Sequence, residues 1–177
     1  MRKSMFWILV IIGSLVGLIL LVTLIGAFLP TDHIASRTLA LPQPPEAVWQ
    51  VVTDFAQQPK WFSEVTSAER LPDQNGHARW REKFGGNMEA TLEVIEEKPP
   101  QRLLRKIVGD DLPFGGQWEY EIKPLPVGSQ ITVTERGFVR NPLFRFMSRF
   151  VFGHSTTIEK YLQSLAAKFD APAQISE

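Results

Sequence analysis

Three histidines and two glutamates are the side chains in this sequence that could carry chemistry. His33, His77 and His154 lie far apart, and none forms a His-x-x-His or His-Glu-x-x-His spacing, so the sequence predicts no metal site. Glu82 and Glu135 each share one face of an expected strand with apolar residues. If those faces are buried, two carboxylates enter the interior, where each must be paired or protonated.

Each of these candidates has two interpretations. His154 falls on the apolar stripe of an expected C-terminal helix, where it is either an acid or base facing a cavity or a core histidine bonded to a carbonyl or an acid. Glu82 and Glu135 either bind a polar ligand group or shift a proton, or they lie near solvent at strand ends. The spacing reveals no catalytic pair, so catalysis stays open and a non-enzymatic role is favoured. The glycine pairs at 85–86 and 115–116 lack the lysine of a phosphate-binding loop, and no cofactor is expected.

The composition excludes several classes of function. The chain of 177 residues has 19 basic and 19 acidic side chains and no cysteine. Its first thirty residues hold two cations and no acid, which leaves 17 basic against 19 acidic side chains for the rest. That balance gives no field able to hold a nucleic acid. The lack of cysteine removes disulfides, thiolate metal sites and a cysteine nucleophile, and the length fits one folded domain.

An uncharged run over residues 5–29 predicts a transmembrane helix. As a helix it would span roughly 37 Å, which exceeds the ~30 Å hydrocarbon layer of a bilayer. Arg2 and Lys3 precede the run, so the positive-inside rule predicts an N-terminus in the cytoplasm and a domain on the periplasmic or extracellular side. The alternative is a cleaved signal peptide, whose apolar region is usually shorter.

The remainder of the chain shows strand and helix periodicities. Short helical segments are expected at 45–55 and 57–62, and a long amphipathic helix at 142–169, in which Gly153 could introduce a bend. Strands are expected, most of them joined by short turns, at 33–40, 65–71, 78–84, 88–95, 103–108, 118–123 and 131–136.

These elements predict an α+β fold in which a curved antiparallel sheet of about seven strands wraps around the long C-terminal helix. A curved sheet leaves a space against that helix that could hold a small ligand. The periodic alternation of side chains between the faces of strands and helices predicts which residues line this cavity, with ordinary core packing as the alternative for each. They are Trp80, Met88, Leu92, Trp118, Tyr120, Val133, Met147, Phe150 and Ile158.

Three short motifs stand out in the domain: residues 41–49 read LPQPPEAVW, residues 53–61 read TDFAQQPKW and residues 97–103 read EKPPQRL. The second resembles the aspartate-phenylalanine, proline and tryptophan signature of the START-like (SRPBCC) superfamily, and of its polyketide cyclase/dehydrase and lipid transport branch in particular. The first is similar to that family's strand-to-helix junction, and the third to its central hairpin. The resemblance covers residues 34–169 and implies the helix-grip fold. The motifs contain no catalytic group. Because the family includes lipid carriers, hormone receptors and aromatase/cyclases, the resemblance does not decide the chemistry.

Together these observations predict a membrane-tethered START-like domain that binds an apolar small molecule or lipid, with the bilayer as its partner. The expected organisation is a cytoplasmic N-terminus and transmembrane helix at 1–30, the domain at 31–170 and a disordered tail at 171–177. One alternative is an interaction or assembly protein of a membrane complex whose cavity is filled by side chains. Another is an enzyme of the cyclase or dehydratase type that would use His154, Glu82 or Glu135.

Overall fold

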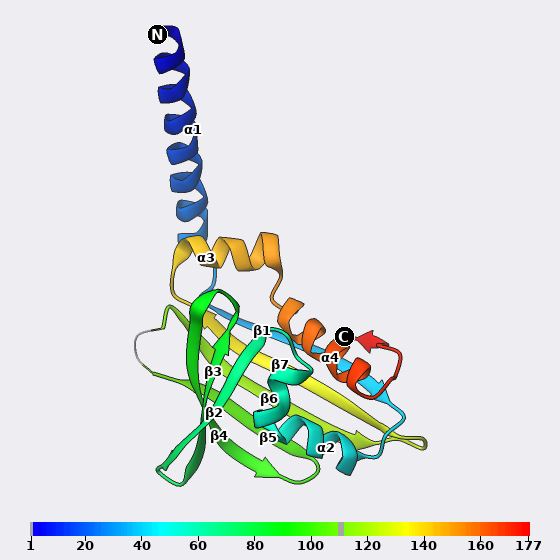
Figure 1. Ribbon diagram of the computed structural model, residues 1–177. Helices are drawn as coiled ribbons and strands as arrows, with labels where there is room; N and C mark the ends of the chain where they lie inside the picture. The colour runs from blue at the N-terminus through cyan, green and yellow to red at the C-terminus, as the bar shows by residue number, and fades with distance from the viewer. Residues whose placement is uncertain (1, 110–111) are drawn as a thin grey trace.

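The structure, a computed structural model, describes residues 2–109 and 112–177. Within them one helix, α1 (Arg2–Ala27), stands away from a domain built of a sheet and helices (Figure 1). Its stretch Met5–Ala27 is long and apolar enough to cross a membrane. Most of this stretch is exposed, and Gly26 near its end is buried. Length and composition of this kind fit both a membrane anchor and a signal sequence.

Eight antiparallel strands form one open sheet in the order β2-β3-β4-β5-β6-β7-β1-β8. The strands are β1 (Asp32–Leu41), β2 (Val65–Gln74), β3 (His77–Phe84), β4 (Met88–Lys98), β5 (Arg102–Val108), β6 (Phe114–Pro124), β7 (Ser129–Val139) and β8 (Ile175–Ser176). Strands β2 to β7 form a meander, and β1 then pairs with β7 along its whole length. The expected α+β architecture is confirmed, with one strand more than the seven expected.

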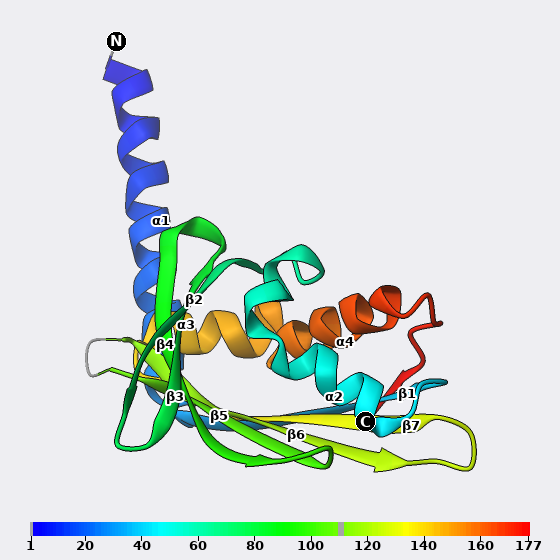
Figure 2. The ribbon, with the colours of Figure 1, turned by 60° about the horizontal axis from the view of Figure 1, so that its bottom comes forward.

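The helices that cover the sheet lie on one of its faces (Figure 2). They are α2 (Pro45–Thr53), η1 (Phe55–Lys60), α3 (Pro142–Met147), η3 (Ser148–Phe152) and α4 (Thr156–Lys168), while the short η2 (Gly85–Asn87) connects β3 to β4. The core forms where α2 and α4 meet the inward side chains of the sheet. Its most buried members include Leu39, Val48, Leu103, Ile122, Ile131, Val133, Ile158, Tyr161, Leu162 and Leu165.

The prediction of one continuous helix over 142–169 was wrong. Helix α3 passes into the π-helical stretch η3, which is followed by Gly153 with φ 78° and ψ 145°, a conformation outside the helical region. Helix α4 then starts at Thr156 in a new direction. The apolar periodicity of the sequence is real, but the glycine divides it, so the residues buried in the core come from the α4 half and none from α3 or η3.

The tail expected to be disordered at 171–177 is instead partly ordered. Strand β8 pairs with β1, with Ile175 opposite Leu39 and Ser176 opposite Thr38. Ile175 also packs against the core, so the tail contributes an apolar contact that short-range sequence patterns do not reveal.

Candidate functional site

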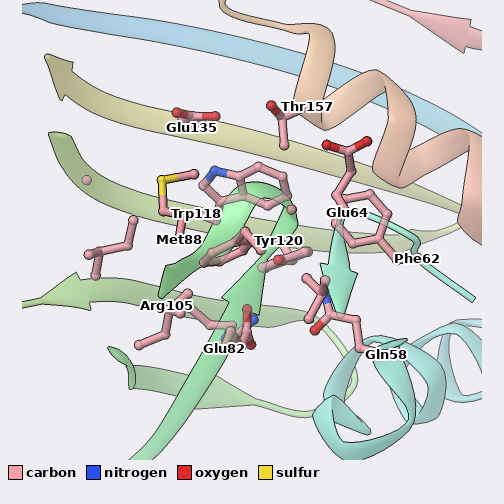
Figure 3. Close-up of a pocket in the computed structure, with 16 residues that line it drawn as sticks. Gln58, Phe62, Glu64, Glu82, Met88, Arg105, Trp118, Tyr120, Glu135 and Thr157 are labelled. Carbon is pink, nitrogen blue, oxygen red and sulfur yellow. Dashed lines mark hydrogen bonds and ion pairs between the residues drawn. The ribbon is translucent and has the colours of Figure 1, made fainter. Parts of the chain in front are cut away.

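A cavity of about 290 Å³ lies between the inward face of the sheet and the helices that cover it. Its walls come from β3 to β7, from η1 and from the start of α4, and apolar side chains make up most of them (Figure 3). The apolar lining includes the side chains of Met88, Leu92 and Ile107 and the rings of Trp118 and Tyr120. Pockets that hold small molecules have this composition, with a few polar groups fixed among apolar ones.

A buried ion pair forms the polar end of this cavity. Glu82 on β3 accepts a hydrogen bond from Arg105 on β5, and the side chains are 2 % and 3 % exposed. The register places Glu82 opposite Ala90 and Arg105 opposite Val94, so the two side chains meet above β4. The Arg105 guanidinium also lies 4.0 Å from the ring centre of Phe55, an arrangement that stabilises a cation with little water around it.

The surroundings of Arg105 fix the charge states at this end. Burial alone would lower the pKa of Arg105, but the Glu82 carboxylate outweighs that effect and the pKa is raised, so the guanidinium stays charged. Burial raises the pKa of Tyr120 to about 12 and that of Tyr161 well above its ordinary value. Both phenols are therefore neutral at physiological pH, and their rings contact each other with centres 5.7 Å apart.

Two polar atoms at this end of the cavity lack hydrogen-bond partners among the described residues. They are Arg105 Nε, a donor, and Gln58 Oε1, an acceptor. Both residues line the cavity, and Gln58 is only 5 % exposed. Buried polar groups are normally paired, so the lack of a partner distinguishes these two atoms among the residues that line the cavity.

A second hollow of about 250 Å³ adjoins the first and shares Ile107, Gly116, Trp118, Glu135 and Thr157 with it. Gly116 has φ 147°, and a Cβ there would lie 2.4 Å from the Arg136 carbonyl oxygen, so only glycine fits without strain. The second hollow lies toward the end of the sheet where α1 enters, because Val139 N donates to Thr31 O there.

This hollow brings together residues that the sequence spacing kept apart. The rings of His33 and His154 stack with centres 4.1 Å apart and planes 17° apart. His33 Nε2 lies 3.3 Å from Glu135 Oε1. Over residues 2–109 and 112–177 no group of three ligating side chains is arranged to hold a metal ion.

His154 lies on the turn between η3 and α4, not on a helix. Burial, followed by the proximity of His33, lowers the pKa of His154, while Glu135 acts in the opposite direction. Of the two interpretations given to this residue, the structure supports neither fully, because His154 faces a hollow while contacting another histidine.

The nine residues predicted to line the cavity fall into three groups. Met88, Leu92, Trp118 and Tyr120 do line it, as do Glu82 and Glu135. Trp80, Val133 and Ile158 pack in or against the core. Met147 and Phe150 lie on α3 and η3, on the far side of the break at Gly153. A role of any of them in ligand binding stays a prediction.

Sequence reasoning missed Arg105, Gln58 and His33 as parts of the site. One signal was available for Arg105, since the alternation of Leu103, Arg105 and Ile107 places a cation on an otherwise apolar strand face. The pairing of His33 with His154 crosses more than a hundred residues, and no local pattern indicates it.

Comparison with known proteins agrees with this architecture. A family model described as polyketide cyclase / dehydrase and lipid transport matches residues 33–170. A search of curated proteins found no match.

Three solved structures illustrate the shared fold. A conserved protein from Geobacillus kaustophilus is 16% identical with a TM-score of 0.65, covering 82% of this chain and 100% of that one. A START superfamily protein from Mycobacterium smegmatis is 17% identical with a TM-score of 0.62, covering 78% and 97%. The Zhui aromatase/cyclase from a Streptomyces species is 12% identical with a TM-score of 0.63, covering 78% and 94%. At such identities the likeness concerns the fold alone.

Proposed function

The chain belongs to the polyketide cyclase / dehydrase and lipid transport family, and on that premise we propose that its domain binds an apolar small molecule or lipid while α1 anchors it in a membrane. The observation that carries the proposal is the cavity of about 290 Å³ beneath the helices, extended by the adjoining 250 Å³ hollow. Their sizes lie near the lower end of the range typical of small-molecule sites.

The polar end of the cavity narrows the class of ligand. A ligand oxygen can accept a hydrogen bond from Arg105 Nε, and a ligand hydroxyl can donate one to Gln58 Oε1. The wall around Leu92 and Trp118 is apolar, so it favours a hydrocarbon or ring body there, while Glu64, Glu135 and Thr157 line the cavity away from the ion pair (Figure 3). We therefore expect an amphipathic ligand whose polar group next to Arg105 is neutral, since Glu82 already balances the charge of Arg105.

The anchor follows from the length and apolar character of α1. An anchor would keep the cavity close to the bilayer, where apolar ligands dissolve. Arg2 and Lys3 before the helix favour an N-terminus in the cytoplasm and a domain on the outer side of the membrane. The open cavity argues against the assembly alternative, which requires an interior filled by side chains.

Native mass spectrometry of the full chain purified from its membrane tests the binding proposal. We expect one co-purified small molecule per chain. In Leu92→Trp the indole occupies the cavity, so the molecule should be lost, and Met88→Trp at the half-exposed rim should weaken its retention. Val127→Trp is the matched control, because Val127 is 79% exposed on the turn between β6 and β7. A wild-type chain that carries no small molecule would contradict the proposal.

A further inference from the structure

The segment formed by α3 and η3 exposes an unusual amount of apolar surface. Phe144, Phe150, Val151 and Phe152 are 56%, 58%, 58% and 60% exposed. Exposing each of these side chains to water costs free energy roughly in proportion to its exposed apolar area. Exposed apolar residues gathered on one short segment indicate a contact surface, whereas scattered single ones do not.

The same segment is cationic. Between residues 137 and 158 the sequence contains Arg140, Arg145 and Arg149 and no acidic residue. Aromatic and aliphatic side chains combined with arginines and without acids are typical of segments that lie in the interface of a bilayer with anionic lipids. A protein partner of ordinary surface composition would offer no particular match to this combination.

The position of the segment relative to α1 supports the same partner. Helix α3 runs across the base of α1 (Figure 1). The two pack closely, since a Cβ on Gly26 would lie 1.9 Å from the Pro142 carbonyl oxygen. Arg145 Nη1 also donates to Leu29 O at 2.9 Å. A bilayer spanned by α1 would therefore have its surface at the level of α3 and η3.

We infer that α3 and η3 form an interfacial surface that inserts its apolar side chains into the bilayer leaflet from which α1 emerges. This inference rests on the proposed membrane anchor. The apolar side chains would reach roughly 5–10 Å into the boundary between head groups and acyl chains. Phe152 also lines the second hollow together with Phe114, so this end of the cavity would face the leaflet. An amphipathic ligand then has a route between the bilayer and the cavity that avoids bulk water.

Spin labels on introduced cysteines test this surface, because the chain contains no cysteine of its own. The full chain is placed in phosphatidylcholine nanodiscs with and without phosphatidylglycerol, and collisions with oxygen and with a water-soluble nickel complex are measured. Phe150→Cys reports on the surface, with Phe144→Cys as a second position should the first disturb folding. Val127→Cys is the control, since its turn lies at the end of the sheet remote from α1 (Figures 1 and 2). Leu15→Cys, in the middle of α1, reports on the anchor alone.

The expected result is an oxygen-to-nickel collision ratio at Phe150 several times that at Val127, increased further by phosphatidylglycerol. A label at Phe150 as accessible to nickel as the one at Val127 would overturn the inference. Low accessibility to both reagents would overturn it too, because it would mean that protein covers the segment. A lipid-exposed label at Leu15 in either case would leave the anchor intact, and an aqueous one would reject the anchor itself.

Discussion

Arg105 and Glu82 hold opposite charges in the least hydrated part of the domain. A buried pair of this kind contributes little to stability compared with an apolar pair of the same shape, because both charges lose their water. Removing only one partner is different, since the other charge then stays buried without compensation. The pair is therefore best understood as a device that keeps a guanidinium at the end of the cavity that we propose to bind a ligand.

Replacing Glu82 alone should destabilise the protein strongly. We expect Glu82→Gln to lower the free energy of unfolding by roughly 3–5 kcal/mol, because Arg105 is only 3% exposed and would lose its counter-charge. The double variant Glu82→Leu with Arg105→Met should recover most of that loss. Chemical denaturation of the full chain in detergent measures both. A single variant as stable as the wild type would show that water or another group compensates Arg105.

His154 should make stability depend on pH. Its pKa is lowered in the folded state by burial and by the proximity of His33, so the unfolded chain binds the proton more readily. The folded state is then at full stability above the ordinary pKa of 6.5 and loses stability as the pH falls below it. In melting temperatures measured from pH 7.5 down to 5.5, His154→Gln should decline less than the wild type. Parallel curves would contradict this assignment.

At the level of single residues, strand alternation placed Leu92, Trp118 and Tyr120 on an inward face, and all three line the cavity. For Glu82 alternation left two alternatives open, a buried carboxylate or one near solvent, and the structure has it buried. Alternation could not pair Glu82 with Arg105, because the two strands are separated by β4 and their contact depends on two successive registers. The register between strands is set when the sheet assembles, so it cannot be predicted from the sequence of a single strand.

At the scale of elements, the break between η3 and α4 has the largest consequences. Periodicity predicted one long helix, since the apolar positions continue at three- and four-residue steps across Gly153. The structure turns the chain there, which directs Ile158 and Leu162 into the core and leaves Phe150 and Phe152 outside. Whether a glycine continues or ends a helix depends on tertiary contacts, and this is why the pattern alone gave the wrong answer.

Gly153→Ala tests whether this break is intrinsic. Residues other than glycine are strained at φ 78° and ψ 145°, so we expect a loss of roughly 1–3 kcal/mol in the free energy of unfolding. Gly85→Ala is the matched control, because its backbone has no positive φ and a Cβ there meets nothing within 4 Å. If α3 and α4 preferred to join, alanine would instead raise both the helix signal in circular dichroism and the stability.

The whole molecule couples an apolar helix to a ligand-binding fold through one compact junction. The sequence predicted the helix and the domain separately, because each has its own local pattern. It did not predict their junction, since Gly26 meets Pro142 and Arg145 meets Leu29 only when distant segments come together. The relative orientation of the two parts therefore depends on a few contacts, and it decides which end of the cavity faces the membrane.

Arg145 is the side chain on which that orientation depends most. It donates hydrogen bonds to the carbonyl oxygens of Leu29, Val139 and Arg140 at 2.9, 3.0 and 2.8 Å, which joins the end of α1 to the end of β7. Without it three charge-assisted hydrogen bonds are lost, one of them to Leu29 in the segment after α1, and that segment can rotate relative to the sheet.

Electron–electron distance measurements between spin labels at Leu15→Cys and Val127→Cys should show this loss. In full chains held in nanodiscs, we expect one narrow distance distribution for the otherwise unaltered protein and a clearly broader one for Arg145→Ala. Arg149→Ala is the matched control, because Arg149 is an exposed arginine four residues further along the same segment. Equal widths for all three chains would mean that the packing of Gly26 against Pro142 is sufficient to fix the domain.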